Sequence, residues 1–403
     1  MAFDVKKNII MTIASKSAIL LLNFLVLVLT TRLWGAEGRG VIAMFMADIS
    51  LLAIIANIFT GSSVSYYLKR TGSSRLLAIA LLWISLSSIG GALVFHYFEK
   101  ENLALFFFII SVFLGILAFF NSSYVGTQRI KQYNLLTVLQ PLMLLIFMIL
   151  FYYFWDSSYR AYFYAQVLSL VILTVGCLCL DKNHYSFSGM KFLVPVAFRS
   201  FKFGLQTELS NFLQFFNYRL SFYFLTYYIG NASVGVFSIG VTIAEAIWIV
   251  SRSISMVQYS KILGDKNEIE ARKGTNEVAK YSFLITLLIL IVANLLPGEL
   301  YTFIFGSEFV DVKRILLILS PGVLLIAVSN VFGHYFSAMG KLRILVVKSL
   351  AGVLVTLLLS IFIVKRLQID GASLVNMSSN VVTSLILFVA YWWYGKKGKC
   401  ENK

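Results

Sequence analysis

Charge is scarce in this sequence. Only 13% of the 403 residues are Asp, Glu, Lys or Arg, whereas 59% are hydrophobic and the mean hydropathy is +0.84. A soluble domain could not shield that much apolar surface with so few charges. Proline is also rare, with four residues, and long polar segments are few, which leaves no room for a separate soluble domain. The composition therefore excludes a soluble protein and predicts a polytopic membrane protein.

Cysteine is nearly absent as well. The three cysteines, Cys177, Cys179 and Cys400, are too few and too poorly spaced for a disulfide framework. Two lie near the end of an apolar run and one lies in the C-terminal tail. We interpret them as free thiols that face a reducing cytosol.

The sequence also lacks the motifs of common enzymes and pumps. It has no G-x4-G-K-[ST] loop for nucleotide phosphates, no H-E-x-x-H zinc motif and no Asp-x-Asp. No segment expected outside the membrane is long enough for a glycosyltransferase or polymerase site. We therefore expect a transporter and not an enzyme, with no cofactor and no metal. The net charge of +16 does not indicate nucleic acid, because Lys and Arg gather on the cytoplasmic loops of membrane proteins.

Apolar runs of roughly 20 residues recur along the whole chain, and each is long enough to cross a bilayer as a helix. The strands of a membrane barrel would show shorter, alternating segments, so the spans must be helices. The first run is too long for a signal peptide, and we expect it to be retained as a span. About twelve spans are expected, at residues 8–32, 40–66, 76–97, 103–127, 134–154, 161–180, 201–229, 234–258, 279–296, 314–338, 345–364 and 371–394.

Lys and Arg divide unevenly among the connecting segments. If the N-terminus is cytoplasmic, the cytoplasmic segments carry roughly three times as many of them as the outer ones. This bias predicts twelve spans with both termini in the cytosol.

The chain divides into two similar halves. Residues 1–180 form a predicted N-terminal six-helix bundle, residues 181–200 a cytoplasmic linker with an interfacial segment, and residues 201–403 a C-terminal six-helix bundle. "GAEGRGV" (35–41) matches "GNASVGV" (230–236) as G-x4-G-V, and "GTQRI" (126–130) matches "GKLRI" (340–344) as G-x-x-R-I. A six-plus-six repeat is typical of transporters whose substrate site lies between the repeats. The expected fold is an all-α polytopic membrane protein with two six-helix bundles around a central cavity.

Five ionisable residues lie well inside the expected spans, where a charge costs about 2.5–3.5 kcal/mol. All five belong to the first two spans of a half: Lys16, Asp48, Glu208, Arg219 and Glu245. At about 100° per residue, Glu208 and Arg219 fall on one helix face. We expect such faces to line a hydrated cavity. The alternative is that the charges form buried interhelical pairs that only lock the packing.

The same faces carry the candidate site residues. Lys16 and Arg219 are predicted to hold an anionic headgroup, because cations suit phosphate and Arg binds it bidentately. Asn211 and Phe215 share the face of Arg219, and Asn23 shares the stripe of Lys16. The acidic candidates are counter-ions, acceptors for sugar hydroxyls or coupling-ion sites, and the sequence does not rank these roles: Asp48, Glu208 and Glu245.

Four stretches carry a resemblance to a known family: "SKSAILLLNFLVLVLTTRLWGAEGRGVIAMF" (15–45), "YVGTQRIKQYN" (124–134), "FGLQTELSNFLQFFNYRLSFYFLTYYIGNASVGVFSIGVTIAEAIWIV" (203–250) and "GKLRI" (340–344). In this order and spacing, they resemble Wzx-type O-antigen flippases of the multidrug/oligosaccharidyl-lipid/polysaccharide (MOP) exporter superfamily. The family often has Arg-x-Asp in its seventh span. Here Arg219 matches the basic position, but Ser221 stands in the acidic place, so no role of that carboxylate carries over.

The resemblance implies a flippase that moves an undecaprenyl-pyrophosphate-linked oligosaccharide from the cytoplasmic to the outer leaflet of a bacterial inner membrane by alternating access. The resemblance is compatible with a polysaccharide polymerase and a chain-length regulator as partners. It is also compatible with transport that is coupled to protons or sodium through the acidic candidates. Two alternatives stay open. A cation-coupled multidrug exporter of the same superfamily would favour an acidic cavity, and a lipid II flippase usually carries two additional spans.

Overall fold

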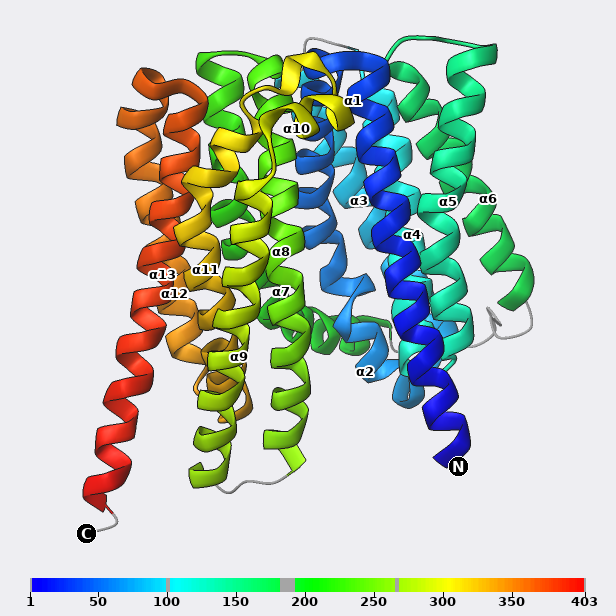
Figure 1. Cartoon of the computed structure of the whole chain (residues 1–403). Coiled ribbons are helices and arrows are strands. Elements are labelled where there is room, and N and C mark those ends of the chain that lie inside the picture. The colour runs from blue at the N-terminus through cyan, green and yellow to red at the C-terminus, as the bar shows by residue number, and fades with distance from the viewer. Residues whose placement is uncertain (1, 99–101, 182–192, 265–267, 402–403) are drawn as a thin grey trace. The chain divides into compact units, whose positions relative to one another are not determined.

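The protein is entirely helical within the described residues, which in this computed structural model are 2–98, 102–181, 193–264 and 268–401. The predicted all-α class is therefore confirmed. Residues 182–192, which hold most of the predicted linker, lie outside the described part of the chain. The elements are α1 (Ala2–Thr60), α2 (Ser62–Thr71), α3 (Ser73–Phe98), α4 (Ala104–Gly126), α5 (Ile130–Phe154), α6 (Arg160–Asp181), α7 (Leu193–Tyr228), α8 (Asn231–Gly264), α9 (Glu268–Leu295), α10 (Gly298–Phe305), η2 (Ser307–Phe309), α11 (Val312–Ala338), α12 (Leu342–Leu359), η3 (Ser360–Val364) and α13 (Lys365–Glu401) (Figure 1).

Nine helical segments in the described residues are long and apolar enough to cross a membrane. Two of these, 14–68 and 343–394, have 55 and 52 residues, whereas one crossing needs about 20. α7 is not among the nine, because its amide and charged side chains make it too polar. The structure also contains a short helical segment that the apolar pattern did not predict, α10 with η2, between α9 and α11.

The chain forms two compact units. Unit 1 contains residues 1–34 and 45–212, and unit 2 contains residues 35–44 and 213–403. The boundaries therefore pass through α1 and through α7. The division of the sequence into bundles at 1–180 and 201–403 stays a prediction.

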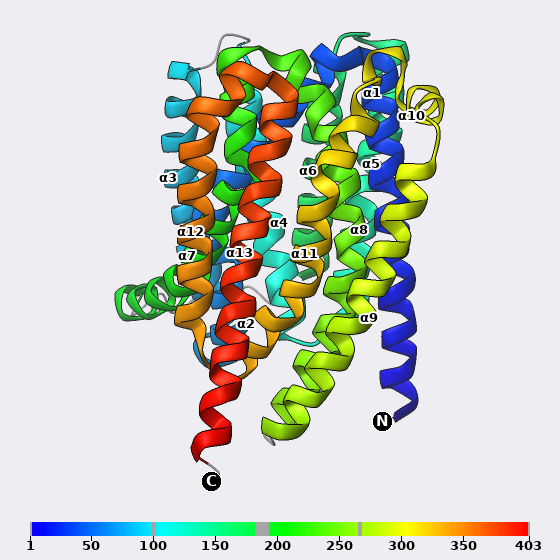
Figure 2. The same ribbon diagram turned by 60° about the vertical axis from the view of Figure 1, so that its left-hand side comes forward.

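Each unit has its own aromatic core. In unit 1, α4 packs against α3 and α6, and the ring of Phe45 lies 4.5 Å from that of Phe163. In unit 2, α11 packs against α8, α9 and α13, and Tyr335 and Phe336 are fully buried between them. Figure 2 shows α11, α12 and α13 side by side. Aromatic side chains, which could equally well face lipid, instead pack between the helices and stabilise each unit.

The predicted loop near residue 35 is a break of one residue inside α1. Gly35 has φ 61° and ψ −162°, a conformation that side chains rarely adopt. The N–H of Ala36 then donates to the carboxylate of Glu308 at 2.6 Å, which caps the helix that restarts there. Arg39 donates to the hydroxyl of Ser238 at 3.2 Å, so the segment 35–44 is fastened to unit 2.

The two G-x4-G-V motifs cross each other within unit 2. A Cβ at Gly40 would lie 1.8 Å from the carbonyl oxygen of Asn231, and a Cβ at Gly235 would lie 2.0 Å from that of Ala36. Gly40 and Gly235 are equivalent positions in the two motifs, as are Ala36 and Asn231. The motif is therefore a reciprocal helix crossing in which each glycine admits the backbone of the other helix.

The G-x-x-R-I match is displaced by two residues from the structural repeat. The turn between α4 and α5 has its positive φ at Gln128 (61°), followed by Arg129 at φ −82°, ψ 62°. The turn between α11 and α12 has its positive φ at Gly340 (71°), followed by Lys341 at φ −88°, ψ 52°. Gln128 therefore corresponds to Gly340, although the letters align Gly126 with Gly340. The two turns repeat, but the backbone sets their register and the matching letters do not.

Candidate functional site

The charged centre of unit 2 is an ion pair between α7 and α8. The guanidinium of Arg219 contacts both carboxylate oxygens of Glu245, at 3.0 and 3.2 Å, in a two-pronged arrangement. Both side chains are about a quarter exposed (27% and 26%), and Arg219 also lies over the ring of Phe222 at 5.1 Å. The predicted site residues Arg219 and Glu245 are thus brought together, 26 positions apart in the sequence.

Aromatic and amide groups border this pair. Tyr218 and Trp248 lie with their ring centroids 5.1 Å apart. A small pocket lies beside Glu245, lined by these two rings and by Asn376 and Asn380. Rings and amides side by side are the groups that stack on sugars and hydrogen-bond to their hydroxyls.

Two further cations extend the site. The charge of Arg252, two helical turns beyond Glu245 on α8, acts on Lys348 of α12 and on His334 of α11. It also acts on Tyr218, together with Arg219 and Glu245. Among the described residues, neither Arg252 nor Lys348 forms an ion pair. The Arg219–Glu245 pair and the cations Arg252 and Lys348 all belong to unit 2, on α7, α8 and α12.

Sequence reasoning missed Arg252 and Lys348 as site residues. Arg252 shares a sequence stripe with Ser238 and Glu245 at intervals of seven, which was the available signal. Lys348 carries no such signal, because α12 shows almost no amphipathic pattern.

Phe215 lies in the core of unit 2, with 8% of its surface exposed. It precedes Arg219 by about one turn on α7. Asn217, between them, donates to the backbone oxygen of Ser349 at 3.2 Å and ties α7 to α12.

The other predicted residues belong to unit 1. Lys16 and Asn23 are exposed on the first part of α1, and Asp48 is half-buried on its last part. Glu208 is buried, with 6% of its surface exposed, and accepts a hydrogen bond from the exposed Asn211 at 2.9 Å. The predicted common face of α7 therefore contains the boundary between the units, with Glu208 and Asn211 on one side and Arg219 on the other.

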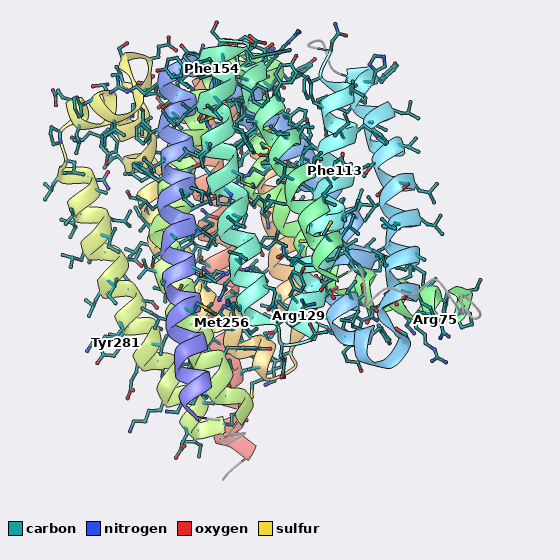
Figure 3. The ribbon with its side chains drawn as sticks, turned by 90° about the vertical axis from the view of Figure 1, so that its right-hand side faces the viewer. Arg75, Phe113, Arg129, Phe154, Met256 and Tyr281 are labelled. Carbon is teal, nitrogen blue, oxygen red and sulfur yellow. The ribbon has the colours of Figure 1, made fainter. Side chains whose placement is uncertain are left out.

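A second ion pair fastens one end of unit 1. Arg129, at the start of α5, contacts Asp181 at the end of α6 at 2.5 Å and lies over the ring of Tyr124 at 4.9 Å. Asp181 is almost fully buried, with 2% of its side chain exposed. Figure 3 shows Arg129 at the end of unit 1 opposite Phe154. This pair joins three helices and, with a buried carboxylate, its role is structural.

The sequence matches the family described as "polysaccharide biosynthesis protein" over residues 5–259, more than half of the chain. The chain therefore belongs to the polysaccharide biosynthesis protein family. It is 24% identical over 296 residues to the capsular polysaccharide biosynthesis protein CapF of Staphylococcus aureus, which covers 67% of this chain and 69% of that protein.

Solved structures of transporters share the fold. The lipid II flippase MurJ in its inward closed conformation matches with a TM-score of 0.73 and 13% identity, over 95% of this chain and 87% of that chain. An inward-facing multidrug resistance transporter of the MATE family matches with a TM-score of 0.70 and 14% identity, over 95% of this chain and 98% of that chain. The Vibrio cholerae MATE transporter VcmN matches with 0.67 and 14%, over 97% of each chain. The chain therefore has the fold of these transporters, and nine helical segments in its described part are long and apolar enough to cross a membrane.

Proposed function

We propose that this transporter is a flippase for an undecaprenyl-pyrophosphate-linked oligosaccharide, the repeat unit of O-antigen or a similar surface polysaccharide. It moves this lipid-linked unit from the cytoplasmic to the outer leaflet by alternating access. The observation that carries the proposal is the cation-rich site of unit 2, with Arg219 held by Glu245 and with Arg252 and Lys348 unpaired among the described residues.

The chemistry of that site suits a diphosphate. The two-pronged contact of Arg219 with Glu245 presents the guanidinium as a fork, which matches a phosphate as well as a carboxylate. A diphosphate replaces Glu245 as the partner of Arg219, and Arg252 and Lys348 offset its remaining charge. Tyr218 and Trp248 then offer rings for the sugars.

In this proposal the residues of unit 1 complete the path. Lys16 and Asn23 on α1 and Asn211 on α7 are proposed to contact the headgroup or its sugars. Asp48 serves as a counter-ion. Polysaccharide polymerase and a chain-length regulator, when present in the same membrane, receive the flipped unit.

The proposed topology has twelve crossings in a bacterial inner membrane, with both termini cytoplasmic. The segments 14–68 and 343–394 each cross twice, and α7 crosses once as a polar helix held within the protein. With the inside negative, the membrane potential favours outward movement of an anion by about 2.3 kcal/mol per charge per 100 mV.

Deleting the gene in its own bacterium tests the function. We expect single lipid-linked repeat units to accumulate and surface polymer to disappear, with both restored by the wild-type gene. Normal polysaccharide with heightened sensitivity to cationic drugs would contradict the proposal and indicate a multidrug exporter. Arrested peptidoglycan synthesis with accumulated lipid II would indicate a lipid II flippase.

A further inference from the structure

The hairpin of α12 and α13 turns without a glycine at its sharpest residue. Gln368 has φ 51° and ψ −124°, a left-handed conformation that residues with a Cβ rarely adopt. The segment that precedes it, η3, is π-helical, and such segments are rare and frequently found at functional sites. Strained backbone of this kind also clusters at functional sites. The hairpin tip, defined here as residues 360–370, therefore calls for a reason beyond joining two helices.

Two contacts hold the hairpin tip in one arrangement. A Cβ at Gly371 would lie 2.6 Å from the carbonyl oxygen of Ile363, so the backbone after the turn packs directly against the backbone before it. Asp370 forms an ion pair with Arg314, near the start of α11. The strained Gln368 lies between Ile363 and Asp370, and these contacts keep it in place. The hairpin tip is thus attached to α11, at the end of unit 2 opposite the C-terminus (Figure 1).

Two adjacent cations stand on this fixed tip. Lys365 and Arg366 are both exposed, and neither forms an ion pair with any described residue. The carboxylate that follows them in the sequence, Asp370, is already paired with Arg314. The positive charge of Lys365 and Arg366 is therefore left for a ligand outside the chain.

Apolar side chains flank the two cations. Phe362 and Leu367 are 69% and 50% exposed. Cations beside exposed apolar side chains at the end of a membrane helix lie where acyl chains meet headgroups. In the predicted orientation this end faces the outer leaflet, where Lys and Arg are disfavoured, so the positive-inside bias does not account for two adjacent cations here.

We propose that the hairpin tip of unit 2 binds the phosphate of an anionic phospholipid. Lys365 and Arg366 contact the phosphate oxygens, since ammonium and guanidinium groups both pair with phosphate, and Phe362 and Leu367 contact the acyl chains. The site is distinct from the pocket beside Glu245, which other residues line. Lipid binding does not depend on the proposed function, and only its assignment to the outer leaflet rests on the proposed topology.

Native mass spectrometry of the purified full-length protein tests the site, with phosphatidylglycerol titrated against the zwitterionic phosphatidylethanolamine. We expect the wild type to bind its first phosphatidylglycerol more tightly than phosphatidylethanolamine. Lys365→Gln with Arg366→Gln should lower the affinity for phosphatidylglycerol by roughly 30-fold, because two cations near an anionic lipid are lost. An unchanged affinity in this variant, or no preference for phosphatidylglycerol in the wild type, would overturn the proposal.

Two matched variants separate charge from structure. Lys261→Gln with Lys273→Gln removes two exposed cations elsewhere in unit 2 and should leave the first phosphatidylglycerol in place. Lys365→Arg with Arg366→Lys keeps both charges and should bind like the wild type. An equal loss of affinity in either variant would contradict a phosphate site at the hairpin tip. If the neutral double variant does not fold, Lys365→Gln alone replaces it, with an expected loss of roughly fivefold.

A second lipid distinguishes a resident phospholipid from the proposed cargo. Farnesyl diphosphate carries the diphosphate and a short polyprenyl chain but no sugar, and it is titrated under the same conditions. We expect it to bind the hairpin tip no more tightly than phosphatidylglycerol does. A site that binds the diphosphate and not phosphatidylglycerol would belong to the cargo and would overturn the proposal. The gene-deletion experiment decides the proposed function separately, because these titrations measure binding and not transport.

Discussion

The crossing of the two glycine motifs permits a quantitative test by adding one methyl group to each helix. In Gly40→Ala the new Cβ would start 1.8 Å from a backbone oxygen, and in Gly235→Ala 2.0 Å, whereas real Cβ contacts essentially never fall below 3.0 Å. The helices must therefore separate by roughly 1 Å or more, because neither obstacle is a movable side chain. Such overpacking costs about 1–3 kcal/mol.

Helix propensity works in the opposite direction and must be subtracted. Replacing glycine by alanine inside a helix stabilises it by roughly 0.5–1 kcal/mol. Gly90→Ala on α3 supplies this term alone, since nothing lies within 4 Å of a Cβ there. The difference between Gly40→Ala and Gly90→Ala is then the packing cost, and Gly235→Ala should show a similar difference.

The double variant is the decisive member of the set. The first methyl group forces the helices apart, which also makes part of the room that the second methyl group needs. The double variant should therefore lose less unfolding free energy than the two single variants lose together. We expect a coupling of about 0.5–3 kcal/mol, measured from the free energy of unfolding in SDS titrations of the purified protein in micelles. Single variants as stable as Gly90→Ala, or a fully additive double variant, would refute a reciprocal crossing.

Three other predictions concern charged contacts. Arg219→Ala should abolish accumulation of surface polymer in the complementation assay while the protein still inserts, and Arg219→Lys should restore part of it; full activity of a well-expressed alanine variant would contradict the diphosphate role. Glu308→Ala should cost about 0.5–2 kcal/mol of unfolding free energy, because the helix restarting after Gly35 loses its cap; stability equal to the wild type would show that the cap is dispensable. Arg129→Ala should cost about 3–5 kcal/mol, because it leaves the buried Asp181 carboxylate unpaired, and a second change of that residue to Asn should recover part of the loss; no recovery would place the cost elsewhere.

Much of the candidate site could be found from the sequence, since charges inside apolar spans are costly and persist there for a reason. That reasoning located Arg219, Glu245 and Glu208. It placed Glu208 and Arg219 on one face and left open whether their charges were paired. In the structure Glu245 pairs with Arg219, whereas Glu208 has no cationic partner among the described residues and belongs to the other unit. Helical periodicity relates residues on one helix, but pairing across helices depends on the crossing and rotation of both.

The glycine motifs show the same limit in a different form. The sequence shows that the motif is repeated, but it does not show that the two copies touch. A glycine at a close helix crossing cannot be told from a glycine in a turn by sequence alone. Gly35 and Gly40 stand five positions apart, and one breaks α1 while the other receives the carbonyl of Asn231. The G-x-x-R-I match aligned the wrong residues. The two turns correspond at the left-handed residues Gln128 and Gly340, which are not paired by the shared letters.

Composition and the length of the apolar runs were enough to predict a helical membrane protein, because a bilayer accepts only chains whose backbone groups are satisfied within each span. The order of its motifs indicated a resemblance to polysaccharide flippases, and the family model places the chain in the polysaccharide biosynthesis protein family. The pairing of Arg219 with Glu245 and the reciprocal contact of Gly40 and Gly235 emerged only with the packed helices. These features depend on contacts of a few ångströms between residues that are distant in the chain. Local sequence pattern does not predict such contacts.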